Sequence, residues 1–400
     1  MAAASDKARF YLEQSVPELK EYEKIKVFSK DEIASIMKKR SEFEHKINAR
    51  GPSPADFARY AEYEMNLDTL RRKRIKRLAI KAPTHTGQRR IFFILDRATR
   101  KFHGDISLWM QYIEYTRKQR AHKKLSQIFT SALRLHPTEV ELWICAALYA
   151  LEDHADMTQA RGYMQRGLRF CKNSRALWLQ YAKLEMIYIS RIAARHKILG
   201  LDSKADHKKV HPHNEDIDLD APHLTSEDVN PTLEKDQVDE IALETLNSTP
   251  ALSGAIPIAI FDAAMKQFND DVLLGRDFYT TFTEFGELPC SKRVMSHVVE
   301  RLMECHPASA QTQICYLRLP VEGIRPTSPE FPRGLAKSLS RLKECTATDS
   351  ANGLSEEVTK WLTPLLTTDD LDPALRQAIE ATVNKVKRAM STGSTAKGRT

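Results

Sequence analysis

The sequence predicts an all-α protein built as a helical-repeat solenoid, a superhelix of antiparallel helix pairs. Glycine accounts for only 14 of 400 residues, whereas strong helix formers such as Leu, Ala, Glu and Lys are plentiful. A large aromatic, followed three positions later by an aromatic, apolar or small residue, recurs at Trp109, Trp143 and Trp178, with spacings of 34 and 35 residues. A small residue precedes each start by 11 positions. This period and this register are typical of stacked two-helix repeats.

The recurring aromatic residues are expected to form the core between repeats, because a single helix pair cannot bury its apolar face alone. Their helical spacing favours this interpretation over a platform for stacking nucleic-acid bases. The pattern weakens later in the chain, where Gly275 and Gln313 occupy the aromatic start but an aromatic residue stays at the third position. We expect Trp178→Ala to lower the free energy of unfolding by about 3–5 kcal/mol. The predicted repeat core consists of Phe57, Tyr60, Trp109, Tyr112, Trp143, Trp178, Tyr181, Phe278 and Tyr316.

Composition and turn residues divide the chain into six segments. Ser29 followed by Glu32 predicts a capped helix start in the first segment, and the run from Asn214 to Asp220 is strongly acidic. The expected segments are an N-terminal helical docking or cap region at residues 1–51, repeats at 52–200, an acidic flexible insertion at 201–253, degenerate repeats at 254–320, C-terminal helices at 321–390 and a disordered tail at 391–400.

Charge and cysteine content narrow the class of protein. The net charge of +8 is moderate and fits nucleic-acid or acidic partners as well as lysine-rich solvated helices. The six cysteines form no CxxC pair, which indicates reduced thiols in a cytosolic or nuclear protein. The longest apolar runs are too short to cross a membrane.

The densest charge run lies at residues 71–77, and two more arginines follow shortly after it. Ile75 and Leu78 keep an apolar seam, which predicts a packed helix with a strongly basic outer face. The run fits three interpretations equally: a nuclear localisation signal, a contact with RNA phosphates, or a solvated face. Candidate contacts with RNA or an acidic partner are Arg71, Arg72, Lys73, Arg74, Lys76, Arg77, Arg89 and Arg90.

No motif for reaction chemistry is present. The sequence contains no phosphate-binding GxxxxGK[ST], no GxGxxG, no GxSxG and no HExxH. We therefore expect no catalytic residues, no cofactor, no bound metal and no small-molecule substrate.

The aromatic, tyrosine and glutamate spacing, seen in full at Trp178, Tyr181 and Glu185, resembles HAT (half-a-TPR) repeats. Three further stretches resemble the U3 small nucleolar RNA-associated protein 6 family, and the similarity is specific over about residues 10–188. They are Phe10-Tyr11-Leu12-Glu13 with Val16-Pro17-Glu18-Leu19, then Lys38-Lys39-Arg40-Ser41-Glu42-Phe43-Glu44 continuing to Gly51, and Gly87-Gln88-Arg89-Arg90-Ile91-Phe92-Phe93 continuing to Thr99.

The resemblance implies a non-enzymatic scaffold in the nucleolus, a subunit of the UTP-B complex. That complex belongs to the small-subunit processome, which works with the U3 snoRNP on pre-ribosomal RNA. The implied partners are WD40-propeller subunits, docked largely through the N-terminal helices and the repeat surfaces. The candidate docking residues are Phe10, Tyr11, Leu19 and Phe43.

Two other functions stay open at this point. The first is a direct RNA-binding ribosome-biogenesis factor that uses the surface from Arg71 to Arg90, and the second is an mRNA-processing HAT-repeat scaffold.

Overall fold

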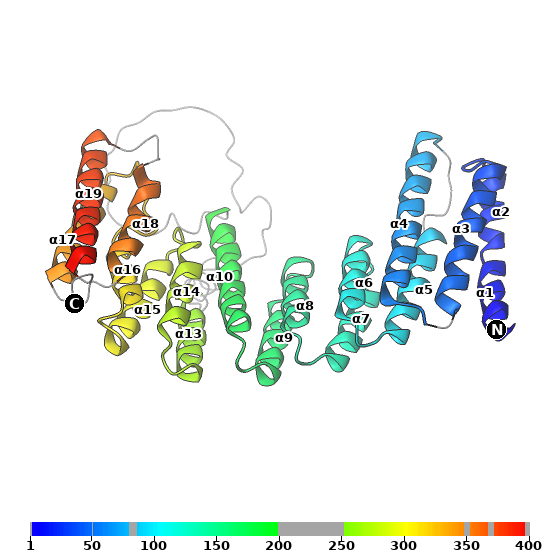
Figure 1. The fold of residues 1–400 in the computed structure, drawn as a ribbon, viewed down its shortest axis with the longest axis horizontal. Helices are drawn as coiled ribbons and strands as arrows, with labels where there is room; N and C mark the ends of the chain where they lie inside the picture. The colour runs from blue at the N-terminus through cyan, green and yellow to red at the C-terminus, as the bar shows by residue number, and fades with distance from the viewer. Residues whose placement is uncertain are drawn as a thin grey trace, which may run out of the picture. The chain divides into compact units, whose positions relative to one another are not determined.

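The computed structural model describes residues 2–49, 51–79, 86–198, 252–347, 353–366 and 372–396 (Figure 1). Every secondary-structure element in these ranges is an α-helix, which confirms the predicted all-α helical-repeat class. None of the described helices combines the length and the apolarity that a membrane crossing requires. The predicted acidic insertion lies outside the described residues except for its last two positions.

Two compact units make up the chain, and their boundary falls within one helix. In the first unit, Met1–Ala146, α4 packs against α5, α5 against α6, and α6 against α7, so helices adjacent in sequence are neighbours in space. The helices of this unit are α1 (Ala2–Glu13), α2 (Val16–Lys24), α3 (Lys30–Asn48), α4 (Pro54–Arg77), α5 (Thr86–Lys101), α6 (Ile106–Lys118), α7 (His122–Leu135) and the first part of α8 (Val140–Glu152).

In the second unit, Ala147–Thr400, the stacking continues across the acidic stretch of sequence. Helix α10 packs against α9 before it and against both α13 and α14 after it. Helix α19 runs past residue 391, where the sequence predicted a tail to begin. The helices are the rest of α8, then α9 (Met157–Phe170), α10 (Arg175–Ile198), α13 (Ala255–Gln267), α14 (Val272–Thr283), α15 (Ser291–Cys305), α16 (Ala310–Arg318), α17 (Phe331–Ala347), α18 (Leu354–Leu366) and α19 (Pro373–Ala396).

Local sequence signals set several helix starts. The capping box predicted before α3 is present: Glu32 N donates to Ser29 Oγ at 3.2 Å, and Ser29 N donates to Glu32 Oε2 at 2.9 Å. Pro17 sits in the first turn of α2, where its missing N–H costs nothing. The carboxylates of Asp105 and Asp156 cap α6 and α9 by accepting backbone N–H groups that have no partner within the helix.

The repeat core lies where the pattern places it, with two exceptions. Trp178 and Tyr316 are only half-buried, so Trp178→Ala should cost less than the 3–5 kcal/mol expected from the sequence. Three of the small residues that precede the aromatic starts, Ala98, Ala132 and Ala264, are fully enclosed. The buried members of the core are Phe57, Tyr60, Trp109, Tyr112, Trp143, Tyr181 and Phe278.

Each tryptophan of the repeat also closes the turn before its own helix. The indole Nε1 donates to the carbonyl six residues upstream, at 3.0 Å for Trp109, 2.9 Å for Trp143 and 3.1 Å for Trp178. Gln313, which occupies the same repeat position, makes the equivalent bond from Nε2 to Pro307 O at 3.3 Å. The glutamine therefore keeps the hydrogen bond that the indole makes in the other repeats but lacks the aromatic ring.

The other departure from the pattern, Gly275, is explained by a larger neighbour. A Cβ at this position would lie 2.5 Å from a methyl group of Leu302 on α15. Leu302 stands 11 residues before Gln313, where the earlier repeats have alanine or glycine. The larger side chain of Leu302 on the facing helix thus fills the space that a tryptophan at position 275 would occupy, so the core stays filled.

Candidate partner-binding surfaces

The basic run on α4 does not form one continuous cationic face. The side chain of Arg71 is only 2% exposed and lies against Asp68, whose Oδ1 accepts from Arg71 Nη2 at 2.8 Å. Arg72 Nη2 contacts the other oxygen of the same carboxylate at 2.7 Å and donates to Gln119, which directly follows α6. Two of the eight candidate RNA contacts are therefore engaged by a carboxylate one turn away on the same helix.

Arg74 and Arg90 are held by residues of the N-terminal helices. Arg74 donates to both oxygens of Glu32, at 2.8 and 2.7 Å, and its guanidinium stacks over the ring of Phe28. Arg90 Nε reaches Glu18 Oε2 at 3.3 Å. Both arginines link helices to one another, so they serve the fold of the first unit.

The expectation of a strongly basic outer face on α4 is corrected accordingly. Four of the eight cations are paired with carboxylates, and the four exposed cations without an ion pair among the described residues are Lys73, Lys76, Arg77 and Arg89. Sequence alone overestimated the charge available to a partner, because it could not show which carboxylates lie within reach.

The pair between Glu32 and Arg74 makes the junction of α3 and α4 sensitive to acid. Hydrogen bonds from Arg74 and from Ser29 N lower the pKa of Glu32 to about 2, from an ordinary value of 4.5. Because the folded pKa is lowered, this stabilisation is present above pH 4.5 and is lost as pH falls towards 2.

Glu32→Gln is expected to flatten the acid limb of the stability curve between pH 4.5 and 2. The effect should stay below about 1 kcal/mol, since the side chain is well solvated. Urea denaturation of both proteins across this range measures it. Parallel acid limbs in the two proteins would contradict the assignment.

The four candidate docking residues of the N-terminal helices differ in their surroundings. Phe10 is 56% exposed, and Leu19 is buried in a cluster with Tyr22 and Phe28. Tyr11 lies under the guanidinium of Arg97 at 4.1 Å, and Phe43 stacks on the Tyr60 ring with the centroids 5.0 Å apart. Only Phe10 presents most of its side chain to a partner, while the other three residues pack within the first unit.

A buried ionic cluster holds the N-terminal helices together. Arg40 is 1% exposed, and its Nε and Nη2 donate to the two oxygens of Glu64 at 2.7 and 2.8 Å. Its Nη1 lies 3.7 Å from Glu18, which also accepts from Tyr22 at 2.6 Å. Burial raises the pKa of Glu18, but Arg40, Arg90 and the tyrosine outweigh it and lower the pKa below its usual value.

The same arginine–glutamate geometry recurs in the second unit. Arg161 donates to Glu185 through Nε and Nη2, again at 2.7 and 2.8 Å. In both pairs the arginine precedes the glutamate by 24 residues, and the glutamate stands seven positions after an aromatic start. Both repeat glutamates thus pair with an arginine on the helix that precedes their own. The equal 24-residue spacing was a signal in the sequence that could have identified their partners.

A close approach at Gly87 locks the start of α5 onto α4. A Cβ built on this glycine would lie 2.3 Å from Asp68 Oδ1, and the carboxylate cannot retreat because Arg71 and Arg72 both hold it. Gly87→Ala is therefore expected to lower the free energy of unfolding by about 1–3 kcal/mol. Thermal unfolding measures the loss, with Gly104→Ala as control because nothing lies within 4 Å of its Cβ position. Equal shifts for both variants would contradict this contact.

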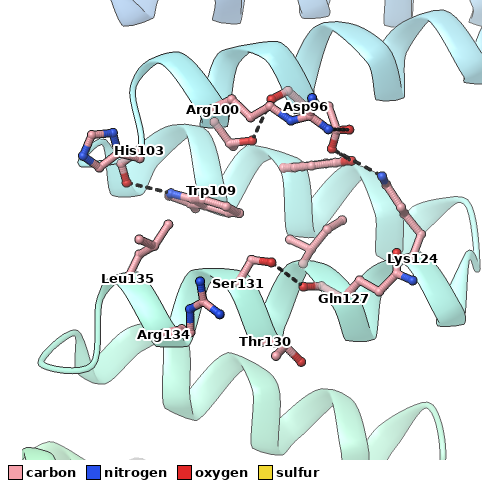
Figure 2. Close-up of a pocket in the computed structure, with 13 residues that line it drawn as sticks. Asp96, Arg100, His103, Trp109, Lys124, Gln127, Thr130, Ser131, Arg134 and Leu135 are labelled. Carbon is pink, nitrogen blue, oxygen red and sulfur yellow. Dashed lines mark hydrogen bonds and ion pairs between the residues drawn. The ribbon is translucent and has the colours of Figure 1, made fainter.

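A groove of about 510 Å³ opens between α5 and α7, with α6 as its floor (Figure 2). Trp109 and Tyr112 of α6 form this floor and are almost fully buried. Tyr112 Oη donates to Asp96 Oδ1 at 2.8 Å, and burial followed by the nearby carboxylate raises the pKa of the tyrosine above its ordinary value. At one end of the groove, the carbonyl of His103 accepts from the Trp109 indole and from His136 Nε2.

Cations dominate the rim of this groove. Lys124 Nζ and an Arg100 nitrogen each lie 3.3 Å from an oxygen of Asp96, and Arg134 lines the groove from α7. The lining thus holds three cations and one carboxylate, which leaves a net charge of about +2 on a surface that includes the exposed apolar side chain of Leu135. This groove could not be recognised in the sequence, because its lining comes from three helices.

A groove at the same repeat position in the second unit has a different lining. It measures about 740 Å³ and is formed by α15, α16 and α17, with Gln313 and Tyr316 in place of the tryptophan and tyrosine. Arg341 stacks on the Tyr316 ring at 4.0 Å, while Glu300 and Glu344 supply negative charge. The lining includes apolar side chains such as Met303 and Leu319. Equivalent grooves of the two units therefore offer opposite charge.

Comparisons with known proteins converge on one family. The sequence model described as U3 small nucleolar RNA-associated protein 6 matches residues 12–97, which run from the end of α1 into α5. A protein of that name from Schizosaccharomyces pombe is 38% identical over 208 residues, which is 50% of this chain and 43% of the relative.

Two homologues of that protein extend the comparison. The Mus musculus homologue is 35% identical over 185 residues, 45% of this chain and 31% of the relative. The Dictyostelium discoideum homologue is 25% identical over 355 residues, 85% of this chain and 56% of the relative. The chain thus spans about half or less of the length of these relatives.

Proposed function

We propose, on the premise that this chain belongs to the U3 small nucleolar RNA-associated protein 6 family, that it is a non-enzymatic scaffold in small-ribosomal-subunit assembly. In this role it acts in U3 snoRNP-dependent processing of 18S pre-ribosomal RNA. Its repeats are of the HAT type, and it works in the nucleolus as a subunit of the UTP-B complex. Its protein partners in that complex are WD40-propeller subunits.

The observation that carries the proposal is that the family match covers helices of the first unit that buried ion pairs hold together. Residues 12–97 contain both members of the Arg40–Glu64 pair and of the pair between Arg97 and Glu44, whose atoms lie 3.0 Å apart. These ion pairs join α3 to α4 and α3 to α5. The matched residues therefore build a specific arrangement of helices, and stacked helices of this kind present extended surfaces to partners.

Affinity purification of the tagged chain from cells tests the scaffold role. Propeller subunits and U3 small nucleolar RNA should co-purify with the chain. The protein partners should still co-purify after nuclease has digested the RNA. Protein docking through apolar grooves should also withstand high salt, whereas phosphate contacts weaken steeply with ionic strength. Recovery with splicing or cleavage factors alone would overturn the proposal in favour of an mRNA-processing scaffold.

Direct RNA binding is a second candidate, favoured by the exposed cations that keep no ion pair among the described residues. Because Arg71 and Arg74 are structural, the informative variant reverses Lys73, Lys76 and Arg77 together. If α4 grips RNA, this triple variant should lose RNA crosslinking while its melting temperature stays unchanged. Unchanged crosslinking would remove the RNA-binding hypothesis for this helix.

A further inference from the structure

We infer that the groove between α5 and α7 in the first unit is a binding site for an acidic peptide segment that carries an apolar residue. It would be an interaction site of the scaffold in its own right, selected by the chemistry of the groove (Figure 2). The inference rests on the proposed scaffold role only in that a scaffold needs ligand-binding surfaces.

Charge is the first argument for this ligand. Arg100 from α5, with Lys124 and Arg134 from α7, contributes three cations, and Asp96 is the single carboxylate of the lining. Asp96 already accepts from Tyr112 and contacts both Arg100 and Lys124. Its single negative charge is therefore divided between two cations and neutralises neither of them fully. An incoming carboxylate would be attracted by the remaining excess of positive charge.

The position of the apolar surface is the second argument. Leu135 is 46% exposed at the end of the groove near Trp109 and His103, whereas Lys124 and Asp96 lie towards the other end (Figure 2). Gln127 is exposed and lines the groove between these ends. Its side-chain amide offers a donor and an acceptor, which matches the polar groups of a peptide backbone. The groove can therefore place one apolar side chain at Leu135 and acidic side chains at the cations.

RNA fits the same surface less well. Base recognition by stacking needs accessible aromatic faces, but Tyr112 is 1% exposed and Trp109 is 6% exposed. The indole N–H is already committed to His103 O, and the tyrosine hydroxyl to Asp96. Asp96, which contacts both Arg100 and Lys124, would also repel a phosphate backbone. These features favour a protein ligand over a nucleic acid.

The equivalent groove of the second unit supports a selective site. There Glu300 and Glu344 outnumber Arg341, which stacks on the ring of Tyr316 and donates to its carbonyl at 2.7 Å. Because the groove position is common to both units but the charge is reversed, positive charge is a property of this groove and not of the repeat. An acidic peptide should therefore bind this groove in preference to its counterpart in the second unit.

Fluorescence anisotropy with the purified full chain tests the inference. The probe is a short fluorescein-labelled peptide of alternating glutamate and leucine, and a lysine–leucine peptide is the charge-reversed probe. The variant Arg100→Glu/Lys124→Glu/Arg134→Glu should bind the acidic peptide at least about tenfold more weakly than the unmodified chain. Repulsion from Asp96 could unfold the triple glutamate variant, so a second variant carries glutamine at the same three positions. This glutamine variant should also bind the acidic peptide more weakly than the unmodified chain, with a smaller loss of affinity.

The matched control reverses three exposed cations outside the groove, as Lys38→Glu/Arg59→Glu/Lys123→Glu. Lys123 is the sequence neighbour of Lys124 on α7 but does not line the groove. Because the control also replaces three cations with glutamate, it changes the net charge by the same amount as the groove variant. Retained affinity in the control, together with loss in the groove variant, supports the site. Equal loss in both variants would show that only net charge matters and would overturn it.

Three other outcomes would also overturn the inference. They are failure of the unmodified chain to bind the acidic peptide, equally tight binding of the lysine–leucine peptide, and a preference for poly-uridine RNA that depends on the same three residues. The last result would assign the groove to nucleic acid. None of these outcomes affects the co-purification test of the scaffold role, because that test measures which proteins and RNA bind the whole chain and does not depend on this groove.

Discussion

Replacing Arg40 with methionine is expected to lower the free energy of unfolding by about 3–5 kcal/mol. The guanidinium is almost fully enclosed, donates to both oxygens of Glu64 and lies near Glu18. Methionine fills much of the space but leaves the Glu64 carboxylate buried without its partner. The loss should appear in urea denaturation followed by circular dichroism, and hydrogen exchange should localise it to α3 and α4.

Two comparisons separate this effect from a general loss of charge. Arg9→Met breaks a pair with Glu13 whose side chains are 81% and 63% exposed, so it should cost less than about 1 kcal/mol. The double variant Arg40→Met/Glu64→Leu removes both charges of the buried pair and should recover part of the loss. Similar costs for Arg40→Met and Arg9→Met would refute the buried cluster as a stabilising element.

The second large effect is expected at Trp109, where truncation to alanine should cost about 3–5 kcal/mol. Its indole is buried between α5 and α7 and donates to the carbonyl of His103, which also accepts from His136. The change therefore opens a cavity and removes one of the two donors that close the turn before α6. Thermal unfolding of the variant measures the combined loss.

Two further substitutions divide that loss into its parts. Trp109→Phe keeps much of the ring volume and removes the indole donor, so it should cost about 1 kcal/mol from the hydrogen bond. Trp178→Ala should cost less than Trp109→Ala, because Trp178 is only half-buried. A larger loss at Trp178 than at Trp109 would contradict the burial that the structure shows.

The repeat core was predictable because its signal is local and periodic. Aromatic residues and small residues recur at a constant spacing, and a helix turns this spacing into one face. Even the departures follow a physical rule: Gln313 keeps the hydrogen bond of a tryptophan, and Leu302 takes up the volume that Gly275 lacks. That rule becomes visible only when both sides of a contact are known.

The availability of the basic residues was predictable only in part, because two of the four pairings depend on residues distant in sequence. Asp68 lies three and four positions before Arg71 and Arg72, so this contact had a local signal. The partners of Arg74 and Arg90 are Glu32 and Glu18, which come from other helices. For the same reason the grooves were missed, since each combines side chains from three helices.

The helical class, the repeat period and the residues that resemble one family could all be recognised in the sequence, because they depend on order along the chain. Which arginines pair within the fold, which stay exposed and which repeat position forms a cationic groove became known from the packing of the helices. Whether a charge is available to a partner depends on the groups that lie within a few ångströms of it. In stacked helices those neighbours come from residues tens of positions away.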